Sequence, residues 1–111
     1  KKKKKNAFNQ NINSWDVSKV TDMRFIFAGA DVFNQPLNGW VTTSLTELRS
    51  AFALTSTFNK NINSWNTTGV TDMSYVFAGA TNFNQPLNNW DVSNVTTFNV
   101  CLLQLLLLID L

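Results

Sequence analysis

The stretch FNQPLNNW at residues 83–90 decides the fold, because almost the same eight residues occur three more times in the chain. The other copies are FNQNINSW at 8–15, FNQPLNGW at 33–40 and FNKNINSW at 58–65, so the step between copies is 25 residues. A period of this length, with the apolar positions retained, predicts a solenoid in which each coil buries its apolar face against its neighbours. We therefore expect an α/β repeat of four 25-residue coils, built from short parallel strands and helical turns.

Within each coil the spacing of the apolar residues changes from a strand pattern to a helical pattern. Around the tryptophans apolar and polar residues alternate, as at Leu87, Trp90 and Val92, which predicts a short strand centred near each Trp. From Val70 to Ala80 the spacing follows one face of a helix or of a tighter helical turn. Each coil is thus expected to run from a strand into a helical turn.

Two columns, meaning sets of residues at corresponding positions of successive coils, are predicted to be structural. The tryptophan column is predicted to pack in the core, and the asparagine column to hydrogen-bond turn backbone groups and its own members along the stack. Stacking of sugars or bases on the tryptophans, and ligand contacts by the asparagines, are the alternatives. The columns are Trp15, Trp40, Trp65 and Trp90, and Asn9, Asn34, Asn59 and Asn84.

One outward column between the inward strand positions is the candidate interaction face. Because stacked strands lie about 4.8 Å apart, its side chains are expected to form a ladder on the sheet surface. An ordinary solvated strand is the alternative, and calcium is disfavoured because the Gly-rich Asp turns of calcium-binding β-rolls are absent. Rows of Ser and Thr make ice binding a rival function. The column consists of Asp16, Val41, Asn66 and Asp91.

The amino-acid composition argues against most kinds of catalytic site and metal site. The chain has no His and one Cys, so the common imidazole ligands and bases and the multi-Cys zinc patterns are missing. We predict no catalytic residues, no metal site and no cofactor, and hence no enzyme. Five of the nine basic residues are Lys1 to Lys5, and the rest of the chain carries four basic against seven acidic residues, a net charge of −3. No nucleic-acid partner is expected for such a mildly acidic body.

The two ends differ from the repeat. The expected organisation is a lysine-rich tail at 1–7, a four-coil repeat domain at 8–102 and an apolar tail at 103–111 that folds back as a C-terminal cap. The apolar run is shorter than the roughly 20 residues that span a bilayer, and no signal peptide is visible. The N-terminal coil is expected to lack a cap and to serve for self-association or for attachment to upstream repeats.

Several motifs carry a family resemblance: WDVSKVTDM at 15–23, FAGATNFNQPLNN at 77–89 and WDVSNVTTF at 90–98. They resemble the BspA-like leucine-rich-repeat surface proteins of bacteria and protists, over residues 8 to about 102. The resemblance implies a right-handed leucine-rich-repeat-like solenoid, displayed at the cell surface or outside the cell, without catalytic residues. The second coil departs from the pattern, since it reads WVTTSLTEL at 40–48.

These observations together lead to a functional expectation. The chain is predicted to be a non-catalytic repeat module that mediates adhesion or protein–protein binding, with a protein or another host-surface ligand as its partner. The alternative is a structural scaffold segment of a longer repeat protein, without a ligand of its own.

Overall fold

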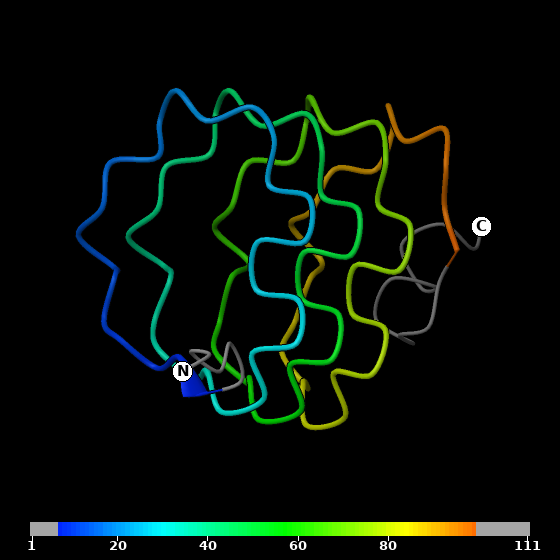
Figure 1. The fold of residues 1–111 in the computed structure, drawn as a ribbon. Coiled ribbons are helices and arrows are strands. Elements are labelled where there is room, and N and C mark those ends of the chain that lie inside the picture. Colours follow the sequence, from blue (N-terminus) through cyan, green and yellow to red (C-terminus); the bar gives the residue numbers. More distant parts are fainter. Residues whose placement is uncertain (1–6, 100–111) are drawn as a thin grey trace.

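The computed structural model describes residues 7–99, which wind as a stack of similar coils (Figure 1). Corresponding residues of successive coils lie side by side, since Asp22 pairs with Glu47, Glu47 with Asp72, and Asp72 with Thr97 in isolated parallel β-bridges. The 25-residue period of the sequence is therefore the period of the structure. The predicted cap at 103–111, and the lysine-rich tail apart from Ala7, lie outside the described residues.

A ladder of aromatic rings runs through the core. The Phe column stacks with ring centroids 5.5 to 5.8 Å apart from Phe8 through Phe33 and Phe58 to Phe83. Rings of a second Phe column lie beside it, as where Phe77 stacks on Phe83 at 4.3 Å. All of these rings except that of Phe8 are buried, so the ladder supplies a large share of the apolar surface that holds the coils together.

The predicted burial of the tryptophan column is confirmed for three of its four members. Trp40, Trp65 and Trp90 are 2 to 3 % exposed, and each indole Nε1 donates to a carbonyl 28 residues earlier, at 2.9 to 3.0 Å. For Trp15 the prediction is wrong, because 58 % of this residue is exposed. Burial of a Trp here depends on a neighbouring coil on the side of lower residue number, and the first coil has none among the described residues.

The predicted strands at the tryptophans are wrong: no β-strand and no α-helix forms within residues 7–99. Beside Trp65 and Trp90 the coils are joined by buried threonine hydroxyls instead of a backbone ladder. Thr67 Oγ1 accepts the N–H of Asp91 at 2.8 Å and donates to the carbonyl of Asp91 at 3.0 Å, and Thr42 bonds Asn66 in the same way. A side chain thus takes the place that a peptide group would have in a sheet.

The predicted helical turn from Val70 to Ala80 is also wrong in its conformation but right about its buried face. Val70, Met73, Val76, Phe77 and Ala80 are all buried. The backbone forms what we call the turn ladder, made of residues 22–30, 47–55 and 72–80, in which odd and even positions bond differently. The ladder segments lie side by side as zigzags at the front of Figure 1.

Hydrogen bonds explain the turn ladder. Alternate N–H groups donate to the next coil, such as Met23 to the carbonyl of Glu47 (3.0 Å) and Phe27 to that of Ala51 (2.9 Å). The N–H groups between them close tight turns three residues back, such as Ile26 to the carbonyl of Met23 at 3.2 Å. Because half of the bonds go to another coil, a helix with bonds only to its own residues is not formed.

Each ladder segment has two residues with positive φ, four positions apart. They occupy the third place of their turns, where a type II turn requires a positive φ and favours Gly. The angles are 60° at Phe25 and 80° at Gly29 in the first coil, 54° at Ser50 and 61° at Leu54 in the second, and 57° at Tyr75 and 74° at Gly79 in the third.

A substitution at Leu54 tests whether the positive φ strains the backbone of the turn ladder. Its column holds Gly29 and Gly79 in the neighbouring coils, and its side chain is 61 % exposed, so little burial is lost on its removal. In Leu54→Gly the left-handed backbone conformation is no longer strained, which stabilises the folded state by about 1–2 kcal/mol. Gly also gives the unfolded chain more conformational freedom, which lowers stability by about 0.5–1 kcal/mol. We expect the free energy of unfolding, measured by urea denaturation, to rise by about 0.5–1 kcal/mol.

The matched control is Ala53→Gly, one residue earlier, where φ is not positive. This change should lower stability by about 0.5–1 kcal/mol. A loss of stability in Leu54→Gly as large as that in the control would contradict the positive-φ assignment.

Candidate functional site

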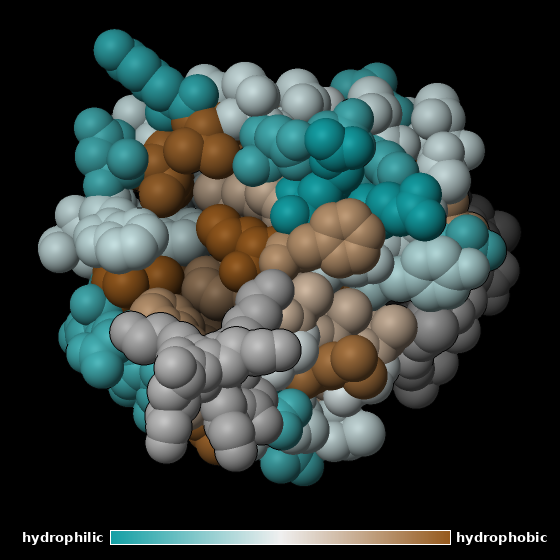
Figure 2. Space-filling model, viewed as in Figure 1, coloured by the Kyte–Doolittle hydropathy of each residue, from teal (hydrophilic) through white to brown (hydrophobic). Residues whose placement is uncertain are grey.

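Four large apolar side chains of the turn ladder are exposed to solvent: Ile26 and, one in each of three consecutive coils, Phe25, Leu54 and Tyr75. Phe25 is 51 % exposed, Leu54 61 % and Tyr75 42 %, although the buried Met23, Phe52 and Phe77 each lie two positions from one of them. Phe25, Leu54 and Tyr75 make a staggered row, which we call the turn face: Phe25 and Tyr75 share a column, and Leu54 lies four positions further along its coil. Figure 2 looks on to this side of the molecule and shows apolar residues gathered over the ladder segments, with hydrophilic residues along the upper edge.

The same three residues are held in a strained backbone. Within residues 7–99 four non-Gly residues have a positive φ, and they are Phe25, Leu54, Tyr75 and Ser50. Ser50 lies between Phe25 and Tyr75 in their column and is buried, with 7 % exposed. The turn therefore directs large apolar groups outward at positions where Gly would be relaxed. Strain of this kind costs about 1–3 kcal/mol per residue and concentrates at functional sites.

Charged side chains border the turn face along the bridged column. Asp22, Glu47 and Asp72 follow one another in successive coils, and Arg24 forms an ion pair with Asp22 at 2.7 Å. The hydrogen bonds from the Arg24 side chain, followed by one from its backbone N–H, lower the pKa of Asp22, and the same carboxylate raises the pKa of Arg24. Both groups are thus charged at neutral pH, and the apolar row has a charged border.

The candidate face predicted from the sequence lies at a different part of each coil. Asp16, Val41, Asn66 and Asp91 are all exposed, as expected. The three polar members cap their own turns, however: Asp16 Oδ1 accepts the backbone N–H of Ser18 at 3.0 Å and its hydroxyl at 2.6 Å. Asn66 and Asp91 accept the N–H two residues on in the same way, each at 2.9 Å.

These turns account for the charge state of the two aspartates. The side-chain hydrogen bond from Ser18, and then its backbone N–H, lower the pKa of Asp16. Ser93 lowers the pKa of Asp91 by the same two hydrogen bonds in the same order. The aspartates of this column therefore already have donors, and Val41 is the member whose side chain offers apolar surface.

The asparagine column performs the structural task predicted for it. The Oδ1 atom of each member accepts the backbone N–H of the next, from Asn9 to Asn34 at 2.9 Å, Asn34 to Asn59 at 2.9 Å and Asn59 to Asn84 at 2.8 Å. Gln35 and Gln85 add side-chain bonds to the member of the previous coil. This column joins the coils at the turn that the repeated FNQ motif encodes.

The described part of the chain offers neither a cluster of metal ligands nor a membrane-spanning helix. Residues 7–99 contain no group of three or more His, Cys, Asp or Glu side chains that could hold a metal ion. Nor does any helix in this described range have the length and apolar character needed to cross a membrane.

The residues of the turn face were missed by the sequence analysis, although a signal for them exists. The inward columns that begin at Phe8 and Ile12 keep an apolar residue in every coil, whereas the column of Phe25 and Tyr75 contains Ser50, and that of Leu54 contains two glycines. An apolar residue in a column that also accepts Ser or Gly is not required by the core. Columns that combine a large apolar residue with Ser or Gly therefore indicate outward-facing positions in this repeat, whereas a column that combines Val with Thr, as at Val17 and Thr42, is buried.

Comparison with known proteins places the chain in a repeat family. A family model described as "Mycoplasma protein of unknown function, DUF285" matches residues 2–105. No curated protein matches the chain, and no solved structure matches it.

Proposed function

The chain belongs to the DUF285 family, and we propose that it is a non-catalytic repeat module that binds a protein partner through the turn face. We also assign the coil stack to the right-handed, leucine-rich-repeat-like solenoids. The parallel bridges between coils and the resemblance of WDVSKVTDM to BspA-like surface proteins support that assignment. The same resemblance favours adhesion at a cell surface as the setting of this binding.

One observation carries the proposal: large apolar side chains are exposed at positions where the backbone is strained. Phe25 and Tyr75 combine a positive φ with about half of their surface in solvent. A purely structural turn would be more stable with Gly at these places, as Gly29 and Gly79 show four residues further on. Aromatic residues are enriched at protein interfaces, and Tyr is among the residue types that contribute most to binding there.

The surroundings of the row also resemble a protein interface. A typical interface has an apolar centre with aromatic residues and a polar, charged border. The turn face has Phe25, Leu54 and Tyr75 at its centre, and the bridged column with Asp22 and its ion pair at its border. The alternative function, a scaffold segment without a ligand of its own, gives no reason for the strained aromatics.

The test uses the full chain on an array of extracellular-matrix proteins and glycans. The double variant Phe25→Gly with Tyr75→Gly removes both rings and relaxes both turns. We expect it to lose binding to the captured protein by about tenfold or more, while its free energy of unfolding stays the same or rises by about 1 kcal/mol. The scaffold function, by contrast, predicts that the wild-type chain captures nothing from the array.

The matched control is Val41→Ala, which shortens an equally exposed apolar side chain outside the turn face. Its binding should equal that of the wild type. Equal binding by the double variant and the wild type would contradict the proposal, and a loss of stability in the double variant would show that the two rings have a structural task instead.

A further inference from the structure

The turns at residues 8–15, 33–40, 58–65 and 83–90, which we call the FN turns, are of two kinds that alternate along the stack. Their fourth position holds Asn11 and Asn61 in the first and third coils, and Pro36 and Pro86 in the second and fourth. The Oδ1 atoms of Asn11 and Asn61 accept the backbone N–H two residues on, at 3.0 and 2.8 Å, a bond for which a Pro side chain has no acceptor. The stack therefore has a second period, of two coils, besides the 25-residue one.

Amide side chains of the FN turns join the first coil to the second. Asn13 Nδ2 donates to Asn38 Oδ1 at 3.2 Å, and Asn13 Oδ1 accepts the N–H of Gly39 at 2.8 Å. Gln35 Nε2 donates to the carbonyl and to the Oδ1 of Asn9, at 3.2 and 3.1 Å. We call this set of four bonds the amide clamp.

The same amide clamp joins the third coil to the fourth. Asn63 Nδ2 donates to Asn88 Oδ1 at 3.1 Å, and Asn63 Oδ1 accepts the N–H of Asn89 at 2.9 Å. Gln85 Nε2 donates to the carbonyl and to the Oδ1 of Asn59, at 3.1 and 3.0 Å. The clamp thus forms where a coil with Asn at the fourth position is followed by a coil with Pro there.

The middle joint, between the second and third coils, lacks the amide clamp. Among the described residues, no side-chain hydrogen bond runs from Asn38 to the third coil. Lys60 stands in the column of the clamping Gln residues and makes no hydrogen bond to the second coil, because an ammonium group is strongly hydrated and its stem is flexible. The asparagine column still crosses this joint, from the N–H of Asn59 to Asn34 Oδ1 at 2.9 Å.

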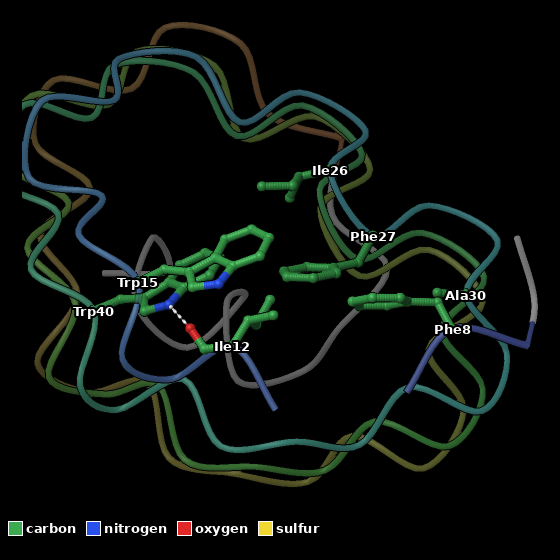
Figure 3. A pocket seen from close by; sticks show the side chains of 7 residues that line it. All are labelled: Phe8, Ile12, Trp15, Ile26, Phe27, Ala30 and Trp40. Carbon is green, nitrogen blue, oxygen red and sulfur yellow. Dashed lines mark hydrogen bonds between the residues drawn. The ribbon is translucent and has the colours of Figure 1, made fainter. Parts of the chain in front are cut away.

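The turn ladder, by contrast, is continuous across the middle joint. Four N–H groups of the second coil donate to carbonyls of the third at 2.7 to 3.1 Å, and they belong to Leu48, Ser50, Phe52 and Leu54. The ladder and the FN turns lie on different sides of the core, as Ile26 and Ile12 show in Figure 3. One side of the middle joint is therefore held by more hydrogen bonds than the other.

Stacking of the Phe column does not distinguish the middle joint from the last one, since Phe58 lies 5.8 Å from Phe33 and 5.8 Å from Phe83. The polar contacts then decide which joint opens most easily. We propose that the stack consists of two coil pairs and that the middle joint is a hinge, which opens along the FN turns while the turn ladder stays closed. The inference goes beyond the proposed function, because it concerns how the coils move and not what the turn face binds.

One tryptophan N–H crosses each joint beside the FN turns and reports its opening. The indole N–H groups of Trp40, Trp65 and Trp90 cross the first, middle and last joint in that order, at 2.9 to 3.0 Å. Figure 3 shows the first of these bonds, from Trp40 to the carbonyl of Ile12. NMR of the full chain in deuterated water measures the three exchange rates. We expect the Trp65 indole N–H to exchange about tenfold or more faster than the other two, because several hydrogen bonds are missing at its joint.

Substitutions in the column of Lys60 test the cause of the opening. Lys60→Gln supplies the missing amide and should slow exchange at Trp65 by about two- to tenfold, the range expected for one net hydrogen bond. Gln85→Lys removes an amide from the last joint and should speed exchange at Trp90 by a similar factor. Lys60→Met is the matched control, because it keeps an unbranched side chain without an amide, and it should leave the Trp65 rate unchanged.

Three outcomes would overturn the hinge. Equal exchange rates for the three indoles would show that the stack opens only as a whole. Slowest exchange at Trp65 would show that the stack opens from its ends. Equal Trp65 rates in Lys60→Gln and Lys60→Met would show that the amide clamp does not hold the joints together.

Discussion

Replacing Trp65 by Ala is expected to lower the free energy of unfolding by about 3–5 kcal/mol. The side chain is 2 % exposed and stacks between Trp40 at 5.8 Å and Trp90 at 6.5 Å. Its Nε1 also bonds the carbonyl of Leu37 at 3.0 Å, and truncation leaves that carbonyl without this bond. The loss therefore combines a large cavity in the middle of the ladder with one buried hydrogen bond. Urea denaturation followed by circular dichroism measures it.

Trp15→Ala is the matched control, because the same residue type occupies the same column with most of its surface exposed. This variant should lose less than about 1 kcal/mol, as expected where little surface is buried. A loss below about 1 kcal/mol for Trp65→Ala as well would mean that the tryptophan column is not part of the core.

Asn59→Ala is expected to lower the free energy of unfolding by about 1–2 kcal/mol. Asn59 Oδ1 accepts the backbone N–H of Asn84 at 2.8 Å and Gln85 Nε2 at 3.0 Å, so the variant loses two bonds between the third and fourth coils. Water can reach this exposed turn and replaces part of the loss, which keeps the effect below that of Trp65→Ala. Affinity for a protein bound at the turn face should not change.

Asn82→Ala provides the comparison for this change. Asn82 is exposed two residues before Asn84 and makes no hydrogen bond among the described residues. Its replacement should leave the denaturation midpoint unchanged. If the two variants behaved alike, the asparagine column would have no structural task, and its members would again be candidates for ligand contact.

Much of the core could be predicted from the sequence because the inner coils of a repeat bury the same positions. Phe58 and Val70 recur as apolar residues at 25-residue steps, and both are completely buried. The candidate site could not be predicted in the same way. Phe25 looks like any other apolar residue of the segment, and its outward direction follows from a positive φ that the residue type disfavours.

The sequence by itself determined the period, the stacking and the inward columns, since a repeated apolar pattern has only its neighbouring copies to pack against. Only the tertiary structure decided the local conformation. The apolar spacing from Val70 to Ala80 is compatible with both a helix and the turn ladder. The segment forms the turn ladder because N–H groups such as that of Met73 donate to carbonyls of the next coil. Likewise Trp15 and Trp65 occupy equivalent positions in the sequence. Trp65 is buried against the coil of lower residue number, whereas Trp15 has no such coil among the described residues and is exposed. Backbone partners and neighbouring coils are distant in sequence, and for that reason local patterns do not contain them.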